Sequence, residues 1–394
     1  MERVKYICFY DKIDAEIERN YVLAATTKID YIISALNKNN IGVDIVSFSG
    51  CVEKKCVFAK GGVSHDGVNT LRLFHSFGSY GFFLTRILSR WFVTLQFIFW
   101  FLISVKKNEE IIIYHSLGYA GLFLFLKRIK SFSIIGEIEE LYQNVTKYSK
   151  KEERDELAFV DACDKYIFPT LLLNKKVNTY NKPFVIIHGL YQVEKDRKVS
   201  FNDNKIHAVY AGTFDPNKGG AAAAAAAAFL PENYHIHILG FGNKEDTEFI
   251  KETIQSTALK SKATVTFDGL LKGEEFIEFL QKCEIGLSTQ DPAAAFNGTS
   301  FPSKILVYMA NGLKVVSIKI PAIEQSGVGS YISYYENQTP EEIADAIRKV
   351  SEDNNFVDGR SVLNRLDEEF IQELNYLINN NHNKKMKNEK RIKY

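Results

Sequence analysis

Hydroxyl groups and a lysine gather just ahead of an apolar stretch with helical spacing. Residues 299–304 read TSFPSK and lead into ILVYMANG, and VVS then has the β-branched residues of a strand. Pro302 suits a first helical turn, because it lacks only an N–H that would have no helical partner. Lys304 adds a positive charge. Hydroxyls of the kind that cap a helix start are carried by Thr299, Ser300 and Ser303. The stretch therefore predicts a helix N-terminus that holds an anion.

A second set of small and basic residues follows an expected strand at 207–214. The strand ends in Gly212 and Thr213, and Lys218 stands just before two glycines that enter the next helix. Free N–H groups and the dipole at a helix start attract an anion. Two lysine-bearing helix starts, both at the carboxyl ends of strands in one domain, predict a site for a nucleotide diphosphate.

Several common catalytic motifs are missing from the sequence. GFGNKE at 240–245 lacks the third glycine of the dinucleotide-binding fingerprint, and there is no P-loop, no G-x-S-x-G elbow and no pair of aspartates two positions apart. His235 and His237 would face the same side of a strand, as two metal ligands would, but the sequence suggests no third ligand near them. We therefore expect no metal and no other cofactor.

Strands and helices must alternate along the first half of the chain to position such loops. Strand-type runs are expected at 4–10, 43–49, 111–117, 165–170 and 184–190, a strand followed by a turn at 131–142, and helical patterns at 19–38, 118–129 and 151–163. This alternation predicts a parallel sheet with helices on both faces.

The second half restarts the same pattern. Strands are expected at 207–214, 235–242, 263–271 and 284–290, and helices at 217–231, 244–259 and 274–283. The predicted fold class is α/β, with two Rossmann-like doubly wound domains that face each other across a cleft. The predicted boundaries are a domain at 1–190, a linker at 191–205, a domain at 206–350, a final helical segment at 351–380 and a basic tail at 381–394.

Composition narrows the classes of function. The 394 residues suit two domains, and the 49 basic and 48 acidic residues nearly cancel, so we expect no nucleic-acid partner. Five scattered cysteines without a C-x-x-C motif, and an N-terminus with charges throughout, indicate a cytoplasmic protein without an export signal.

Two segments point toward a membrane. The apolar part of 81–105, from 91 to 105, is shorter than the roughly 20 residues that span a bilayer. A buried core helix, a helix at the membrane interface with Arg86 and Arg90 at the headgroups, and a spanning helix all stay open. The tail 381–394 carries six basic side chains and one acidic one, which suits either a solvated tail or contact with anionic lipid. A peripheral position on the inner face of the cell membrane is therefore an alternative to a purely cytoplasmic one.

Five stretches of the second half together resemble the retaining, metal-independent GT-B glycosyltransferases of group 1, or family 4. In order they are VYAGTF with NKGG, IHILGFG, VTFDGLL, CEIGLSTQ and FPSKILVYMANGLKVVS, between residues 207 and 317. The first half is similar in pattern, since IIIYHSLGYAG and GEIEELY look like that family's acceptor-side strand ends. The expected helix at 361–379 suits the family's final helix, which packs back on the first domain.

The resemblance implies roles for single residues. Positions matching the donor-binding residues of the family are Gly212, Thr213, Phe267, Asp268, Gly269 and Ser303. Thr299 and Ser300 are donor-binding candidates through their hydroxyls. Lys218 and Lys304 would stabilise the charge that builds up on the leaving diphosphate. His115 is the candidate for orienting or polarising the acceptor. Acidic acceptor-side candidates at a strand end are Glu137, Glu139 and Glu140.

The function implied by the resemblance is hexosyl transfer from a nucleotide-diphosphate sugar to a saccharide or lipid-linked saccharide, as in the biosynthesis of capsule or other surface polysaccharide. One departure matters. The family often has two glutamates eight positions apart, the second of which contacts ribose, and Thr299 and Val307 stand in their places here. A non-catalytic nucleotide-sugar-binding partner protein of the same fold and a UDP-sugar epimerase remain alternatives.

Overall fold

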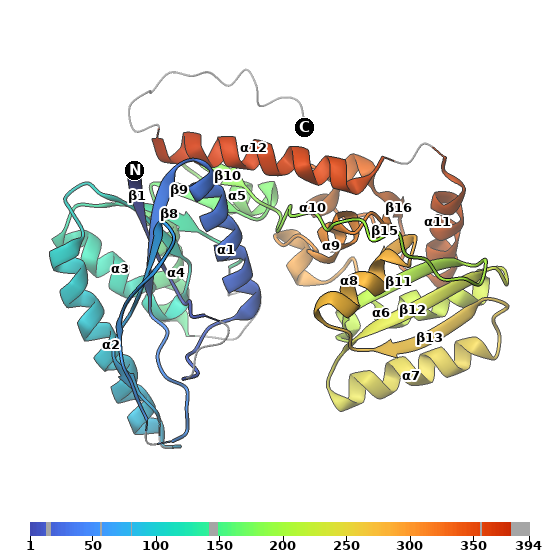
Figure 1. Cartoon of the computed structure of the whole chain (residues 1–394), viewed down its shortest axis with the longest axis horizontal. Coiled ribbons are helices and arrows are strands. Elements are labelled where there is room, and N and C mark those ends of the chain that lie inside the picture. The colour runs from blue at the N-terminus through green and yellow to red at the C-terminus, as the bar shows by residue number, and fades with distance from the viewer. Residues whose placement is uncertain (13–16, 56, 80, 142–148, 355–356, 380–394) are drawn as a thin grey trace. The chain divides into compact units, whose positions relative to one another are not determined.

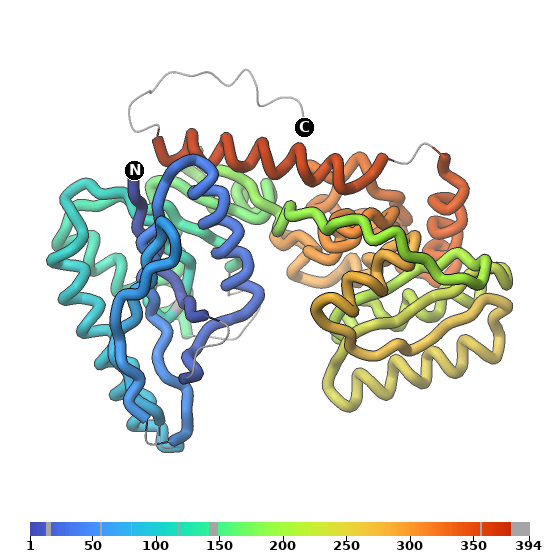
Figure 2. Tube along the Cα trace, viewed as in Figure 1, coloured from blue at the N-terminus to red at the C-terminus, as the bar shows by residue number. Residues whose placement is uncertain are grey.

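The computed structural model describes residues 1–394 except 13–16, 56, 80, 142–148, 355–356 and 380–394. This part of the chain forms two compact units, whose elements are labelled in Figure 1. The first comprises 1–169, 173–187 and the end of the last helix from Phe370, and the second comprises 170–172 and 188–369. Figure 2 traces the chain through both. Each unit has a sheet of its own, and the α/β class predicted from the sequence is confirmed. The basic tail lies outside the described residues.

The first unit is built on an eight-stranded sheet with the order β10-β9-β8-β7-β1-β2-β5-β4. Neighbouring strands are parallel, except that β4 runs antiparallel to β5. The strands of this sheet are β1 (Glu2–Cys8), β2 (Ile41–Ser47), β4 (Gly62–Asp66), β5 (Asn69–Leu73), β7 (Glu110–Tyr114), β8 (Ser133–Glu137), β9 (Lys165–Phe168) and β10 (Phe184–Ile186). A separate small ladder pairs β3 (Phe58–Ala59) with β6 (Ser76–Phe77).

Helices cover both faces of the first sheet, as the alternation predicts. They are α1 (Leu23–Lys38), α2 (Phe83–Ser104), α3 (Leu117–Ile129), α4 (Lys150–Ala162) and α5 (Leu171–Val177). In Figure 1, α2 and α3 lie on one side of this sheet and α1 lies on the other. Asn39 is the C-cap of α1, and Asn40, the next residue, has a left-handed φ of 59°, which explains why the helix ends there. A capping box between Ser149 and Glu152 starts α4.

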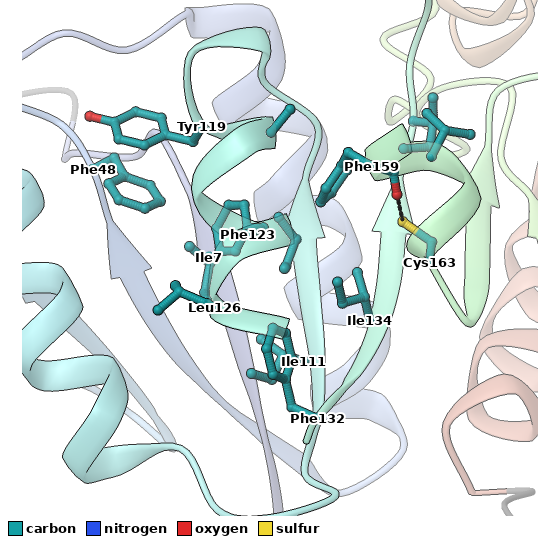
Figure 3. Close-up of a cluster of buried hydrophobic side chains, with 14 of the residues drawn as sticks. Ile7, Phe48, Ile111, Tyr119, Phe123, Leu126, Phe132, Ile134, Phe159 and Cys163 are labelled. Carbon is teal, nitrogen blue, oxygen red and sulfur yellow. Dashed lines mark hydrogen bonds between the residues drawn. The ribbon is translucent and has the colours of Figure 1, made fainter. Parts of the chain in front are cut away.

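Aromatic residues dominate the core between the first sheet and the helices α2, α3 and α4. Phe48 stacks on Tyr119 with ring centroids 3.9 Å apart, and Phe97 lies 4.3 Å from Phe48. Figure 3 shows several of these side chains, including Phe123 and Phe159, converging on strand residues such as Ile7 and Ile134. Fully buried rings of this size supply most of the apolar area that holds the unit together.

Helix α2 differs from the expectation for this segment. It runs over 22 residues, so it is longer than the apolar stretch 91–105, and by length and composition it could cross a bilayer. Only Ser89, Val93, Phe97 and Phe101 are buried, at intervals of four. The interpretation as a buried core helix is therefore wrong, because most of the other residues of the helix are exposed and the rest are only half-buried.

The second unit contains a parallel six-stranded sheet with the order β13-β12-β11-β14-β15-β16. Its strands are β11 (Ile206–Thr213), β12 (Tyr234–Phe241), β13 (Thr264–Gly269), β14 (Ile285–Ser288), β15 (Lys314–Ile318) and β16 (Ser333–Tyr335). Its helices are α6 (Gly220–Ala225), α7 (Lys244–Ala258), α8 (Gly273–Gln281), α9 (Lys304–Ala310), α10 (Pro321–Glu324), α11 (Pro340–Glu352) and the first part of α12 (Gly359–Asn379). Strands β14 and β11 pair centrally, so the loops after both meet at one edge.

The last part of α12 belongs to the first unit. The ring of Phe370 stacks on Tyr31 of α1 with centroids 5.8 Å apart. The side-chain amide of Asn39 donates a 2.8 Å hydrogen bond to the backbone oxygen of Ile371. The chain thus returns to its N-terminal unit for these final turns.

Candidate active site

A pocket of about 420 Å³ lies at the carboxyl ends of β11 and β12 in the second unit. This volume is in the range of small-ligand sites. Its polar side includes Gly212, Thr213, Lys218, Ser303 and Lys304. The structure therefore brings together the two lysine-bearing loops that the sequence placed apart in the chain.

Glycines expose the backbone at this edge of the sheet. Gly240 has a φ of 145°, and a Cβ there would lie 1.7 Å from the backbone oxygen of Gly212. Gly219 has a φ of 78°, and a Cβ would lie 1.7 Å from the oxygen of Thr289. Neither position can hold a side chain without moving backbone. The loops can therefore lie close to each other and to a bound molecule.

Lys304 is a buried cation. Its ammonium nitrogen has no hydrogen-bond partner among the described residues and lies 3.8 Å from the ring centroid of Tyr210. Burial, and then the charge of Lys218, lower the pKa of Lys304 to about 7. An unpaired buried ammonium is costly unless an anion or another acceptor reaches it. This group therefore marks where the pocket requires negative charge.

Lys218 supplies the second cation of the pocket. Its ammonium nitrogen lies 3.7 Å from the ring centroid of Phe296, in cation–π geometry. The lysine ends a 3₁₀ turn, Pro216–Lys218, whose start is capped by the side chain of Asp215. Repulsion between Lys218 and Lys304 is relieved when an anion lies between them.

Helix α9 begins later than the sequence suggested. Its first residue is Lys304, so Pro302 precedes the helix instead of occupying its first turn, and that expectation is wrong. Ser303 is the N-cap residue, but its side chain makes no capping hydrogen bond. The Ser303 hydroxyl is instead free of that role and lies on the pocket wall.

Two predicted hydroxyl residues are not among those that line the pocket. Thr299 is 4% exposed and follows the 3₁₀ turn Ala295–Gly298. Ser300 donates its backbone N–H to the oxygen of Phe296. Val307, which stands where the resemblance suggests a glutamate, does line the pocket and is 37% exposed.

The predicted nucleobase residues also lie off the pocket wall. Asp268 is engaged with His237 and Thr266, and Phe267 packs on Phe214 with centroids 5.8 Å apart. Gly269 ends β13. The apolar wall is instead made by Phe241, Leu270, Leu271, Phe276 and Phe301. The two leucines follow the predicted positions directly, so reading past the end of the strand would have found them.

The expectation that no third ligand lies near His235 and His237 is wrong. His207, near the start of β11, is the register partner of His235 across the sheet. Ligand nitrogens of the three histidines lie within 4.8 Å of one another. The cluster is at the amino ends of β11 and β12, away from the pocket at their carboxyl ends.

His115 and Glu137 are deeply buried in the first unit. His115 is 2% exposed, its ring is stacked on Phe159, and burial lowers the pKa of this histidine to about 4. Tyr6 donates a hydrogen bond to Glu137, and burial and the charge of Glu139 raise the pKa of Glu137 well above its usual range. Both side chains are therefore neutral near pH 7.

Glu139 and Glu140 are the more accessible acceptor-side candidates. Both are half-buried. The carboxylate of Glu139 lies 2.6 Å from the ammonium nitrogen of Lys28, and the pair follows the carboxyl end of β8. A partly exposed ion pair of this kind can bind hydroxyl groups of a sugar through both of its charges.

Comparisons with known proteins agree with this geometry. Residues 205–353 match the family model described as glycosyl transferases group 1. Comparison with curated protein sequences finds no match.

Solved structures share the fold over nearly the whole chain. The E. coli trehalose-6-phosphate structure bound with UDP-2-fluoro glucose has a TM-score of 0.59 at 11% identity and covers 95% of this chain and 97% of its own. Anabaena HepE in complex with UDP has a TM-score of 0.60 at 12% identity, with coverages of 96% and 98%. The pneumococcal O-GlcNAc transferase GtfA, in complex with UDP and GlcNAc, has a TM-score of 0.58 at 10% identity, with coverages of 95% and 97%.

Proposed function

Because residues 205–353 form a group 1 glycosyltransferase domain in a chain with the GT-B fold, we propose that this protein transfers a hexosyl group from a nucleotide-diphosphate sugar to a saccharide or lipid-linked saccharide. The donor is held by the second unit. The similar structures from E. coli, Anabaena and pneumococcus contain UDP or a UDP-sugar, so uracil is the first base to test.

The observation that carries the proposal is the buried ammonium of Lys304. It lines the pocket beside Gly212, has no hydrogen-bond partner among the described residues, and has Lys218 as its charged neighbour. Two positive charges at the end of a pocket with an apolar wall suit a molecule with a diphosphate at one end and a flat base at the other. A neutral sugar alone would leave the charge of Lys304 uncompensated.

The lysines also suit the chemical step. During transfer the bond between the anomeric carbon and the diphosphate oxygen breaks, and its electron pair stays on the diphosphate. The acceptor hydroxyl forms the new bond to the anomeric carbon and passes its proton to the departing diphosphate. Fixed cations that face the developing negative charge lower the barrier, because they need little reorganisation as the charge forms.

We propose that transfer needs no metal ion and retains the anomeric configuration. Among the described residues that line the pocket none is acidic, and Lys218 and Lys304 already supply the positive charge that a metal would bring. Retention rests on the resemblance of the five stretches between residues 207 and 317 to the retaining group 1 enzymes.

On the acceptor side we propose the ion pair of Glu139 and Lys28 as the contact with sugar hydroxyls, because Glu139 follows the end of β8, is partly exposed, and holds the largely buried ammonium of Lys28 beside it. Glu140 lies beside it and is half-buried. His115 and Glu137, being deeply buried, support this edge from beneath. A place in surface polysaccharide biosynthesis follows from the proposed acceptor class and is part of the same proposal.

The exposed face of α2 supports a peripheral membrane contact. Seven large apolar side chains point outward with exposed fractions of 59% to 72%: Phe83, Leu84, Leu88, Trp91, Leu95, Phe99 and Ile103. Arg86 and Arg90 are also exposed, and the helix has no acidic residue. Because Val93, Phe97 and Phe101 are buried in the unit, the helix is held by one face and presents the other. This arrangement suits a helix lying on an anionic bilayer instead of crossing it.

The proposal is tested first by binding. UDP, GDP, dTDP and their sugars are screened for a rise in Tm, and Lys304→Met is compared with Lys262→Met, an exposed lysine of the same unit. A ligand that stabilises the wild type and Lys262→Met but not Lys304→Met supports the site. If none of these nucleotides raises the Tm of the wild type, the donor site is wrong.

Turnover is then measured with the donor that binds. Transfer to a saccharide or a lipid-linked saccharide, detected by mass spectrometry, separates the proposed transferase from the two alternatives. Tight binding without turnover would indicate a binding partner. Release of an altered UDP-sugar in the absence of acceptor would indicate an epimerase.

A further inference from the structure

Three histidines meet on one face of the second sheet, near the amino ends of its strands. His207 is the second residue of β11, and His235 and His237 alternate along β12. Because β11 and β12 are parallel and His207 pairs in register with His235, all three side chains leave the same face of the sheet. None of them lines the nucleotide pocket.

The hydrogen bonds around His207 and His237 fix where their protons lie. Nε2 of His207 is 2.9 Å from a carboxylate oxygen of Asp203, and Nδ1 of His237 is 3.2 Å from a carboxylate oxygen of Asp268. An ionised carboxylate can only accept, so each imidazole donates its N–H to its own aspartate. The other nitrogens, Nδ1 of His207 and Nε2 of His237, then face each other with lone pairs at 2.9 Å.

Two lone pairs at that distance repel unless a proton or a metal ion lies between them. His235 offers a third nitrogen in the same way. The hydroxyl of Thr266 donates to Asp268 over 2.8 Å, so it accepts from Nε2 of His235 at 3.0 Å. This leaves Nδ1 of His235 with its lone pair. One ring nitrogen from each of the three histidines lies within 4.8 Å of the other two.

We propose that His207, His235 and His237 bind a divalent transition-metal ion, with Zn²⁺ as the best match. Neutral imidazoles at alternate positions of one strand and at the facing position of the next are borderline-soft ligands that suit this ion. Asp203 and Asp268 hold the ligand rings from behind, as carboxylates do in zinc sites. A water molecule completes the four ligands.

Binding needs only small side-chain movements. Tetrahedral Zn²⁺ with bonds of about 2.0–2.1 Å places two nitrogens roughly 3.3 Å apart. The rings of His207 and His237 must therefore separate by a few tenths of an ångström, and His235, which is half-buried, must turn toward them. Phe201 stacks on His207 with centroids 4.1 Å apart and shields that side of the site from water.

A route for the ion is open from the surface. A hollow of about 530 Å³ beside Asp268 and Phe279 is rimmed by Glu274, Glu275, Glu278 and Lys282. Lys282 is paired with Glu278 and Arg197 with Glu274, but the acidic groups still outnumber the basic ones, and this excess favours cations. Phe279 lies edge-on to His237 with centroids 5.1 Å apart, so the hollow ends next to the cluster.

The ion would act on stability and not on the reaction. Asp203 and Phe201 belong to the segment that leads into β11, so a metal would fasten this segment to the sheet through His207. The inference does not depend on the proposed function, because nucleotide binding occurs at the opposite ends of the same strands.

The test uses the full-length protein without a polyhistidine tag, stripped with a chelator. We expect one Zn²⁺ to bind per chain, Tm to rise on its addition, and Co²⁺ to give the intense visible bands of a four-coordinate site. His235→Ala should abolish the Co²⁺ spectrum, and Asp268→Asn should weaken Zn²⁺ binding by about 10–100-fold. His65→Ala, an exposed histidine of the first unit, is the control and should bind like the wild type.

Nucleotide binding serves as the folding check for each variant. The inference is overturned if the stripped wild type binds no Zn²⁺ or Co²⁺ more tightly than a variant lacking all three histidines. It is equally overturned if His235→Ala and His237→Asn each keep the one-to-one site and its spectrum. Loss of metal binding with nucleotide binding intact supports it, and this pattern also keeps its outcome separate from that of the donor site.

Discussion

The ammonium nitrogen of Lys304 lies beside the α-carbon of Gly212, so that a Cβ added to Gly212 would come within 3.0 Å of it. The end of β11 and the start of α9 meet at this point. Glycine is required here for space and not for backbone conformation, because the close neighbour is a side chain. The ammonium group of Lys304 can therefore lie against the end of β11 because Gly212 has no side chain there.

Gly212→Ala should push the Lys304 side chain aside and leave the fold intact. We expect nucleotide binding to weaken by about tenfold, or roughly 1.4 kcal/mol, because the ammonium group no longer faces the pocket correctly. Titration calorimetry with UDP measures this. Gly62→Ala, at a position with open space around it, is the control. Equal affinity in both variants would show that the spacing is unimportant.

Lys304→Met should make the protein more stable and much less active. The side chain is buried without a hydrogen-bond partner among the described residues, so its loss should raise the free energy of unfolding by about 1–3 kcal/mol below pH 7. Turnover should fall by about 10²–10³, as for other groups that stabilise developing charge. Denaturant unfolding and initial rates are the measurements. A variant that is less stable and fully active would contradict both the expected gain in stability and the expected loss of turnover.

The stability of the free protein should depend on pH through Lys304. Its pKa is about 7 in the folded state and about 10.4 when unfolded. Below pH 7 both states hold the proton, and the cost of burying the charge is fully present. Between about pH 7 and 10 the unfolded state binds more protons, so the free energy of unfolding rises with pH. Comparing the free energy of unfolding of the wild type and Lys304→Met across this pH range isolates the contribution of Lys304. If the two pH profiles are parallel, Lys304 does not cause the pH dependence.

Nucleotide binding should take up a proton near pH 8. Lys304 is then largely neutral in the free protein, and a diphosphate raises its pKa and returns the charge. Calorimetry in buffers of different ionisation enthalpy should give an uptake of close to one proton for the wild type. Lys304→Met should show none. An uptake that persists in the variant would assign the proton to another group.

Changing the exposed face of α2 should abolish attachment to membranes. Leu95→Glu places a charge in the middle of that face, where the leucine is 60% exposed, and should reduce co-sedimentation with vesicles of anionic lipid by at least about tenfold. Leu259→Glu, at an 88% exposed leucine of the second unit, is the matched control. A different outcome is that the wild type forms dimers and fails to bind vesicles. If Leu95→Glu then disrupts these dimers, the partner of this face is a second copy of the chain.

Much of the fold could be predicted from local pattern. Buried strand runs such as 111–114 and the stop after α1 at Asn39 are set by neighbouring residues alone. The hairpin of β4 and β5 was not predicted from the sequence, because every residue of β4 is exposed and the strand shows no apolar alternation. Asp66 and Gly67, where β4 turns into β5, were the available turn signal. The length of α2 was underestimated, because Arg86 and Arg90 interrupt the apolar run at its start.

The site was harder to predict, because its properties depend on burial and register. The sequence showed that Lys304 is charged but not that it is buried under Tyr210 and lacks a partner. Likewise, His207 becomes a neighbour of His235 only through the pairing of β11 with β12. The available signal was that both β11 and β12 have a histidine as their second residue. The predicted nucleobase residues, Phe267 to Gly269, end just before the two leucines that line the pocket, Leu270 and Leu271. An offset of this size is usual in where a strand ends.

The docking of Phe370 on Tyr31 has a practical consequence for dissecting this molecule. The N-terminal unit is not a contiguous stretch of chain, since its fold is finished by residues from the other end of the sequence. A fragment that stops at residue 187 would expose the surface around Tyr31 and should be poorly soluble. Supplying residues 370–379 as a separate peptide, or splicing them behind residue 187, should restore it.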